Sequence, residues 1–166
     1  MVCNPYIWII ILYLIMATIL DVHDNWKRIL KLPDQIPVFV YQTRFEIVRY
    51  NTEEQLAKGI RSDGQNIAPS YRDREYAEGK FEANSLPGFG TPDLKLTGSF
   101  YKGFYVAVDT EIYEIDSRDS KTDKLLKKYG ENIFGLTQPN KEQYATKSIY
   151  PKIKDYIESR TGLVMQ

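Results

Sequence analysis

The residues of this chain that could take part in catalysis are two aspartates and a lysine in its second half. Asp93 follows Pro92, and Asp119 stands two positions before Lys121 in the sequence DSRDSKTD. Carboxylates in such a pattern can bind a divalent ion that activates a water molecule, and a lysine can stabilise the negative charge that develops. The spacing therefore points to metal-assisted hydrolysis as the first chemistry to consider.

The pattern is similar to that of metal-dependent nucleases, but its context differs from theirs. In such enzymes the acid and the lysine lie on a strand that enters the site. Here Asp119 and Lys121 belong to a run of charges that is typical of a solvated loop. A pattern this short also occurs by chance. We therefore rank a nuclease last of three hypotheses and expect no catalytic, metal-binding or cofactor-binding residues.

Other reactive side chains are scarce. His23 is the only histidine and lies beside an apolar segment, so serine and threonine hydroxyls have no evident base to activate them. Cys3 is the only cysteine, which excludes an internal disulfide and a zinc site built from cysteines. The composition therefore favours a protein that acts without catalysis and without a cofactor.

Length and charge limit the class of protein further. With 166 residues the chain is long enough for one domain with a core and too short for two of ordinary size. We expect a single domain over 38–160, preceded by an apolar leader and an amphipathic helix over 1–32. The 22 basic and 22 acidic residues cancel, so there is no basic surplus to bind a nucleic-acid duplex. The 13 tyrosines and 7 phenylalanines suit sheet cores and contacts between subunits.

The first 20 residues carry no charge, and residues 6–20 are almost wholly apolar. A helix needs about 20 apolar residues to span a bilayer, so this segment is near the lower limit. Three interpretations stay open: a single membrane anchor, a helix buried against partner subunits, or an upstream extension that precedes a start at Met16. Basic residues follow at 27–31, and for an anchor they favour a cytoplasmic location of the remaining chain.

Helical periodicity covers much of the remaining chain. From Leu20 the apolar spacing predicts an amphipathic helix that Pro33 and Pro37 break. A second helix is predicted over 38–60, where Gly59 would end it. Its predicted inner stripe comprises Val38, Tyr41, Phe45, Val48 and Leu56.

Three shorter helices are predicted further along the chain. A charged helix is expected over 71–81, and a compact amphipathic helix should end at Gly130. Thr137 or Asn140 would cap the last helix. Pro151 implies either a kink in that helix or a fresh helix that starts one residue before the proline.

Residues 93–116 carry the strongest strand pattern. An aromatic cluster at 100–105 leads into alternating Val106 and Val108, and a second β-prone run begins at Ile112. Two such runs around a short polar break predict a β-hairpin, although the break lacks the Asn-Gly or Asp-Gly signal that would fix its turn type. The predicted fold class is α+β: a small antiparallel sheet or β-hairpin packed with several helices, plus an N-terminal apolar helix.

The order of short motifs resembles the neck or tail-completion proteins of tailed bacteriophages, particularly forms from phages and prophages of Bacteroidetes-type hosts. The matching motifs are QL at 55–56, GI at 59–60, DG at 63–64, APSY at 68–71, Lys80, DLKLTG at 93–98, FYKGF at 100–104, DSRDSK at 116–121, KYGE at 128–131 and IFGLT at 133–137. The likeness covers about residues 40–157 and leaves out the apolar leader.

This resemblance implies a non-enzymatic virion protein that forms part of a ring between the capsid portal and the tail, assembled in the bacterial cytoplasm. Its partners would be further copies of itself and the portal, connector or tail proteins. Double-stranded DNA would pass through the ring without sequence reading. Residues 6–20 depart from the family pattern and leave a membrane-anchored accessory protein as the second hypothesis.

The resemblance also singles out two segments as structural signatures of the fold or of its subunit interfaces. Their residues are Thr97, Gly98, Phe100, Tyr101, Phe104, Tyr129, Gly130, Phe134, Gly135 and Leu136. Glycines in such places permit backbone angles that other residues resist, and grouped aromatic side chains suit a core or an interface.

Overall fold

A computed structural model describes residues 21–109, 112–162 and 164. The leader at 1–20, and with it the predicted N-terminal apolar helix, lies outside the described residues. The chain divides into two units: one is Pro37–Tyr150, and the other contains the residues before Pro37 and after Tyr150. In the part that the structure describes, no helix is long and apolar enough to cross a membrane.

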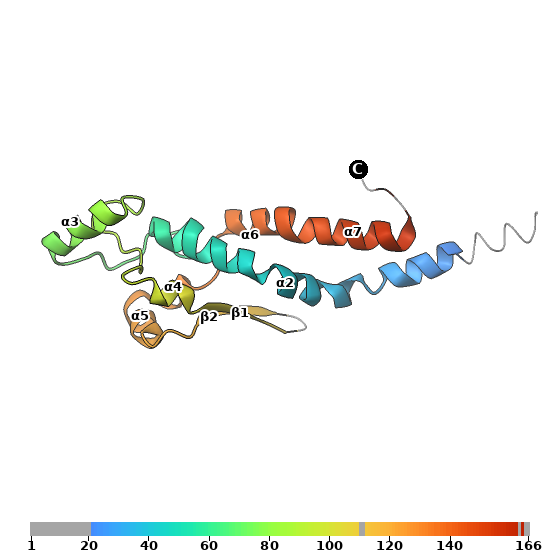
Figure 1. Cartoon of the computed structure of the whole chain (residues 1–166), viewed down its shortest axis with the longest axis horizontal. Helices are drawn as coiled ribbons and strands as arrows, with labels where there is room; N and C mark the ends of the chain where they lie inside the picture. Colours follow the sequence, from blue (N-terminus) through green and yellow to red (C-terminus); the bar gives the residue numbers. More distant parts are fainter. Residues whose placement is uncertain (1–20, 110–111, 163, 165–166) are drawn as a thin grey trace, which may run out of the picture. The chain divides into compact units, whose positions relative to one another are not determined.

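The fold is α+β, as predicted, with helices and one antiparallel pair of strands among the described residues (Figure 1). Residues 21–29 are helical. The further elements are α2 (Leu32–Arg49), a π-helical segment (Tyr50–Gln55), a 3-10 turn (Leu56–Lys58), α3 (Arg74–Ala83), α4 (Ser99–Lys102), β1 (Phe104–Val108), β2 (Tyr113–Ser117), α5 (Thr122–Tyr129), a 3-10 turn (Glu131–Ile133), α6 (Gln138–Tyr144), a second π-helical segment (Ala145–Ile149) and α7 (Tyr150–Thr161).

The prediction that Pro33 and Pro37 break the helix that runs from Leu20 is confirmed at Pro33 and wrong at Pro37, since the first helix ends at residue 29 and α2 begins at Leu32. Pro33 is the second residue of α2. A proline is tolerated there, because the N–H groups of the first helical turn have no partner within the helix. Pro37 lies inside the helix. Its ring meets only the carbonyl of the first turn, so the helix continues. The predicted helical character over 38–60 is confirmed as far as Lys58, and Gly59 caps the end with a φ of 70°.

The predicted inner stripe of this helix is wrong for its first three members. Val38, Tyr41 and Phe45 are 43%, 56% and 70% exposed. The helix instead buries a neighbouring apolar face, made of Phe39, Val40, Ile47 and Tyr50. The sequence offers two apolar faces on one helix, and spacing alone cannot decide which of them meets the core.

Two buried amides hold the core of the Pro37–Tyr150 unit together. Asn51 donates to the carbonyl of Ile133 at 3.1 Å and accepts from the N–H of Gly135 at 3.2 Å. Gln55 donates to the carbonyl of Gly135 at 2.9 Å, and its oxygen accepts from the N–H of Thr137 at 2.8 Å. We call this set of bonds the amide clamp. It satisfies backbone groups that burial would otherwise leave unpaired.

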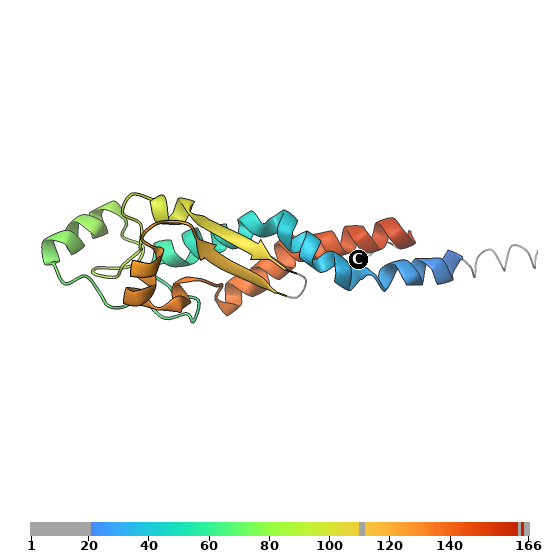
Figure 2. The ribbon, with the colours of Figure 1, turned by 90° about the horizontal axis from the view of Figure 1, so that it is seen from below.

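The hairpin is confirmed. β1 and β2 pair antiparallel, with Phe104 opposite Ser117 and Val108 opposite Tyr113 (Figure 2). A close approach is built in at its base, because a Cβ on Gly103 would lie 2.6 Å from the Ser117 hydroxyl. The aromatic residues just before β1 form the short helix α4 rather than part of a strand.

The last helical region starts as predicted at Thr137, which occupies the N-cap position of α6. At Pro151 no separate helix starts: the backbone stays helical from α6 through the second π-helical segment into α7, and Pro151 is the second residue of α7. Tyr144 is buried, and its hydroxyl lies 2.7 Å from that of Thr43. In the other unit, the Tyr156 hydroxyl donates to the carbonyl of Arg28 at 3.0 Å.

Candidate functional site: a basic groove

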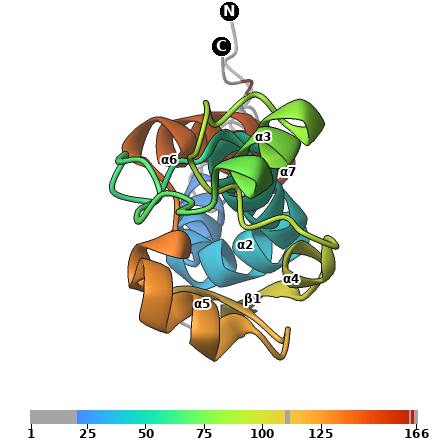
Figure 3. The same ribbon diagram turned by 90° about the vertical axis from the view of Figure 1, so that its left-hand side faces the viewer.

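A groove of about 800 Å³ opens on the Pro37–Tyr150 unit between α3, α4 and α5. Figure 3 views the molecule from the side on which these three helices lie. The walls of the groove are the loop and helix over 69–80, the segment 94–100 and the face of α5. Six basic residues line it: Arg72, Lys80, Lys95, Lys121, Lys124 and Lys128. We call this feature the basic groove.

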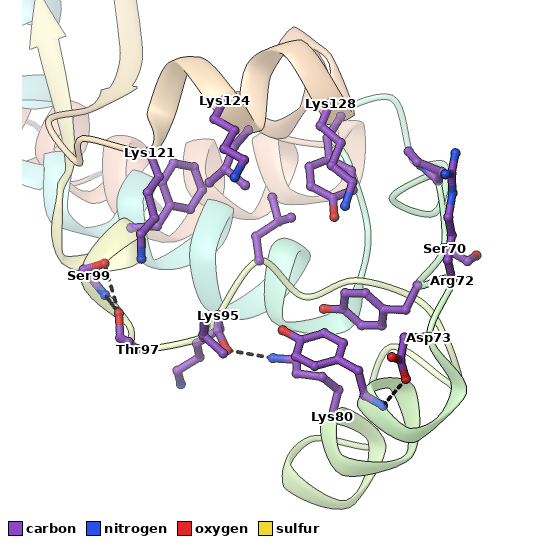
Figure 4. A pocket seen from close by; sticks show the side chains of 18 of the residues that line it. Ser70, Arg72, Asp73, Lys80, Lys95, Thr97, Ser99, Lys121, Lys124 and Lys128 are labelled. Carbon is purple, nitrogen blue, oxygen red and sulfur yellow. Dashed lines mark hydrogen bonds between the residues drawn. The ribbon is translucent and has the colours of Figure 1, made fainter.

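The α5 wall is dictated by helical spacing. Lys121, Lys124 and Lys128 follow one another at intervals of three and four, which places their side chains on one helical face. Figure 4 shows the three side chains on this wall, with Lys80 and Lys95 on the facing one. Several like charges on one concave surface raise the local potential and attract anions.

Lys80 serves the structure of the groove. Its ammonium lies 2.6 Å from a carboxylate oxygen of Asp93 and donates to the carbonyl of Lys95 at 2.7 Å. Asp93 is only 2% exposed, and it also accepts from the amide of Asn84 and from the N–H of Lys95. Asp93 is therefore a buried anchor with its hydrogen bonds satisfied.

Of the other two residues of the proposed nuclease pattern, Lys121 lines the groove and Asp119 does not. A carboxylate oxygen of Asp119 accepts from the backbone N–H of Lys121 at 2.8 Å. This bond, with a further one from the Ser99 hydroxyl, lowers the pKa of Asp119. No group of three His, Cys, Asp or Glu side chains that could hold a metal ion occurs within residues 21–109, 112–162 and 164.

The remaining five cations of the groove, those other than Lys80, make no ion pair within the described part of the chain. Lys128 lies 4.9 Å from the ring centroid of Tyr129, and Lys95 lies 5.9 Å from that of Tyr101. Asp73 is the one carboxylate among the lining residues, and it accepts from the N–H of Tyr76 as the cap of α3. The groove therefore carries more basic than acidic side chains, although the nearby Asp119 carboxylate interacts electrostatically with Lys121.

The floor of the groove is apolar, and part of it is strained. Leu94, Leu96 and Leu125 line it, and Leu96 is 70% exposed. Leu94 has a φ of 54°, a left-handed conformation that costs a residue with a Cβ about 1–2 kcal/mol. The bonds of the neighbouring Asp93 hold this turn in place. Strain of this kind is often retained at functional sites.

Two tyrosines beside Asp93 stay uncharged at physiological pH. Burial, and secondarily the nearby Asp93 carboxylate, raises the pKa of Tyr71 and that of Tyr101 well above the usual value. The Tyr101 hydroxyl donates to the backbone carbonyl of Asp93. Both phenols therefore keep their protons and can serve as hydrogen-bond donors beside Asp93.

The structure brings the two signature segments together. The Phe134 ring lies 6.1 Å from that of Phe100 and 5.2 Å from that of Phe104, measured between centroids. Phe100, Phe104, Tyr129 and Leu136 are buried inside the unit. Gly98, Gly130 and Gly135 take φ values of 79°, 83° and 106°.

Four of the signature residues also line the groove: Thr97, Gly98, Phe100 and Tyr129. The sequence analysis names Lys80 and Lys121 but does not predict that they share a surface with Arg72, Lys95, Lys124 and Lys128. The available signal was the spacing of Lys121, Lys124 and Lys128. Comparison of the chain with protein-family models, with curated proteins and with solved structures finds no match.

Proposed function

We propose that this chain is a structural protein of a tailed bacteriophage, forming part of a ring at the joint between head and tail. The observation that carries the proposal is the exposed stripe on α2. Tyr41 and Phe45 are 56% and 70% exposed, and Val38 adjoins them one turn away. Contiguous apolar side chains on a surface are typical of a protein interface.

The stripe has the composition of an interface. The Arg44 guanidinium lies 4.0 Å from the ring centroid of Tyr41 and 4.7 Å from that of Phe45. Aromatic residues and arginine are enriched where subunits meet. In a ring of identical subunits, such a patch binds a different patch of the next copy.

The charge of the chain suits a ring that surrounds DNA. With 22 basic and 22 acidic residues it has no net charge, so it lacks the surplus that would hold a duplex by its phosphates. Double-stranded DNA could then move through the ring without being retained. The order of motifs over about 40–157, which resembles neck and tail-completion proteins, adds support of a separate kind.

The proposal is tested by the mass of the full chain in mild detergent, measured by light scattering alone and after mixing with the portal, connector and tail proteins of the same phage. We expect a closed oligomer, or a stable complex with one of these partners. Phe45→Lys should weaken the assembly, because it places a charge in a desolvated contact.

Gln42→Lys is the matched control, since Gln42 is exposed on the same helix and lies outside the stripe. It should leave the assembly unchanged. A wild-type chain that stays monomeric and binds none of the three kinds of partner would contradict the proposal. Genes for portal, capsid or tail proteins beside this one would support it.

A further inference from the structure

We propose that the basic groove is a binding site for a nucleoside polyphosphate, with the phosphates on the α5 wall and the base against Tyr76. The site goes beyond the proposed ring assembly and does not depend on it, because the groove lies within one Pro37–Tyr150 unit. Three features of the lining carry the inference: an excess of cations, an exposed aromatic side chain and a limited volume.

The cations of the groove favour a ligand with more than one negative charge. Those that line it and make no ion pair within the described part of the chain are Arg72, Lys95, Lys124 and Lys128. Lys121 adds a further ammonium group, although it also interacts with the nearby Asp119 carboxylate. Lysine binds phosphate as a point charge, and arginine can bind it through two parallel N–H groups. A chain of phosphates therefore matches the charge of the groove.

The α5 wall is shaped to follow such a chain. Lys121 and Lys128 are seven residues apart, which corresponds to about 10 Å along a helix axis, and Lys124 lies between them. Figure 4 shows the three lysine side chains next to one another on this wall. Successive phosphates of one ligand can therefore each meet a different ammonium group.

The opposite wall is held in place by a buried ion pair. The Lys80 ammonium lies 2.6 Å from the Asp93 carboxylate and donates to the carbonyl of Lys95 at 2.7 Å. The strained turn at Leu94 lies between these two contacts. The backbone of Lys95 is thereby fixed, and its ammonium lies 5.9 Å from the ring centroid of Tyr101. A site that is ordered in advance loses less entropy when it binds a ligand.

Tyr76 offers a surface on which a base can stack. It is 44% exposed, and its ring lies 5.0 Å from that of Tyr71 in an edge-to-face contact at 87°, which orients it. Leu94, Leu96 and Leu125 line the groove with these two tyrosines. Bases stack on aromatic side chains, and leucines can cover the apolar parts of a ligand. The lining therefore suits a nucleotide better than an inorganic polyanion.

The size of the groove favours a free nucleotide over a nucleic-acid strand. Its volume of about 800 Å³ is within the range of sites for small ligands. Proteins that hold a single strand contact about 4–16 nucleotides in one fold, which needs a longer surface. A duplex keeps its bases stacked inside, away from Tyr76. An acidic peptide would match the lysines, but its carboxylates give Tyr76 no planar group to stack on.

The test measures the binding of adenosine triphosphate to the full chain in mild detergent at low salt, by isothermal titration calorimetry. Inorganic triphosphate should bind at least about fivefold more weakly, because it lacks a base that stacks. Lys124→Glu with Lys128→Glu should raise the dissociation constant for adenosine triphosphate by at least about tenfold, since hydrogen bonds to charged groups contribute at least that much.

Tyr76→Ala separates the role of the base from that of the phosphates. It should raise the dissociation constant for adenosine triphosphate by at least about fivefold and leave that for inorganic triphosphate unchanged. Tyr76→Phe keeps the aromatic ring and should bind adenosine triphosphate as the wild type does. A residue that only supports the fold would change the binding of both ligands together.

Lys127→Glu with Lys147→Glu is the matched control for charge, because both lysines are exposed in the same unit and do not line the groove. Circular dichroism and melting temperature confirm that each variant is folded. The inference is wrong if the folded wild type binds no adenosine triphosphate, or if the groove variant weakens binding no more than the control. It is also wrong if Tyr76→Ala affects both ligands equally.

A single-stranded oligonucleotide and polyglutamate complete the comparison. Tighter binding of either than of adenosine triphosphate, abolished by Lys124→Glu with Lys128→Glu, would overturn the inference. Light scattering on the same samples separates this site from the proposed function. A monomer that binds adenosine triphosphate supports the site and contradicts the ring assembly, whereas an assembly that binds none contradicts the site alone.

Discussion

Single polar side chains hold the Pro37–Tyr150 unit in shape, and Gln55 is one of them. It is 1% exposed, and beyond its two bonds in the amide clamp its oxygen also accepts from the amide of Asn140 at 2.9 Å. A buried group that loses its partner costs about 1–3 kcal/mol. The stability of the unit therefore depends on a residue that the sequence analysis names only as part of the short motif QL at 55–56.

Gln55→Ala should lower the free energy of unfolding by about 3 kcal/mol, because it leaves the partly buried carbonyl of Gly135 and N–H of Thr137 without their partner. Urea denaturation measures this change. Gln42→Ala is the control, since Gln42 is exposed on α2. A loss for Gln55→Ala no larger than that of the control would show that the clamp does not stabilise the fold.

Tyr101 contributes stability that is lost at alkaline pH. Its pKa is raised in the folded state, so the folded state keeps the phenol proton at pH values where the unfolded state has released it. The contribution is complete below about pH 10, the unfolded value, and declines as the pH rises further. The free energy of unfolding then falls by at most about 1.4 kcal/mol per pH unit for each such group.

Tyr101→Phe should therefore reduce stability near pH 7 by about 1 kcal/mol, through the lost bond to Asp93, and flatten the decline above pH 10. Unfolding free energies at pH 7, 9, 10 and 11 test both effects. The exposed Tyr41 provides the comparison, as Tyr41→Phe should leave the slope as it is in the wild type. An equal slope in both variants would contradict the assignment to Tyr101.

At the scale of elements, two glycines predict opposite effects of the same substitution. Gly59 has a φ of 70°, and a Cβ there would lie 2.7 Å from Thr91 and 2.8 Å from Pro87. Gly79 lies inside α3 with no atom within 4 Å of the added Cβ. The first glycine is required by the structure, whereas the second only weakens a helix.

Gly59→Ala should destabilise the protein by about 2–4 kcal/mol, the sum of left-handed strain and overpacking. Gly79→Ala should stabilise it by about 0.5–1 kcal/mol, because alanine is the better helix former. Thermal melts of the two variants give the signs directly. The account of the turn at Gly59 fails if both substitutions act in the same direction.

The sequence predicted elements better than it predicted surfaces. Alternation of apolar residues was enough for the hairpin, and a glycine was enough to end α5, because both signals are local. The predicted break at Pro37 is wrong because a proline near the start of a helix removes few hydrogen bonds. The predicted burial of Val38, Tyr41 and Phe45 is wrong because burial depends on packing partners that lie far away in the sequence.

The groove could not be predicted from local patterns for the same reason. Arg72, Lys95 and Lys124 lie in three separate segments, and only tertiary folding makes them the walls of one surface. The aromatic signature is recognisable in the sequence as a motif. Its place in the core depends on the tertiary contact of the Phe134 ring with those of Phe100 and Phe104.

At the scale of the whole molecule, the chain is neutral in total but its charges are distributed unevenly. Positive charge gathers in the groove, and the stripe on α2 is apolar. A contact through the groove should respond to salt, whereas one through the apolar stripe of α2 should persist. Two kinds of contact in one assembly can therefore be separated by ionic strength.

Raising sodium chloride from about 0.1 M to about 1 M shortens the screening length from about 10 Å to about 3 Å. The binding of adenosine triphosphate in the groove should weaken over this range, as calorimetry would measure. A chain with Lys124→Gln and Lys128→Gln, in which the groove has less positive charge, should be less sensitive to the change. Equal salt dependence in both chains would place the electrostatic contact elsewhere.

The amide clamp also has a consequence for synthesis on the ribosome. Its bonds join residues that are 80 to 84 positions apart, so they close only after the segment around Gly135 has been made. A nascent chain that has emerged only as far as Tyr129 carries the whole groove but lacks the backbone groups that Asn51 and Gln55 bind. Until those groups leave the exit tunnel, the two amides must be hydrated, and the core of the unit cannot close.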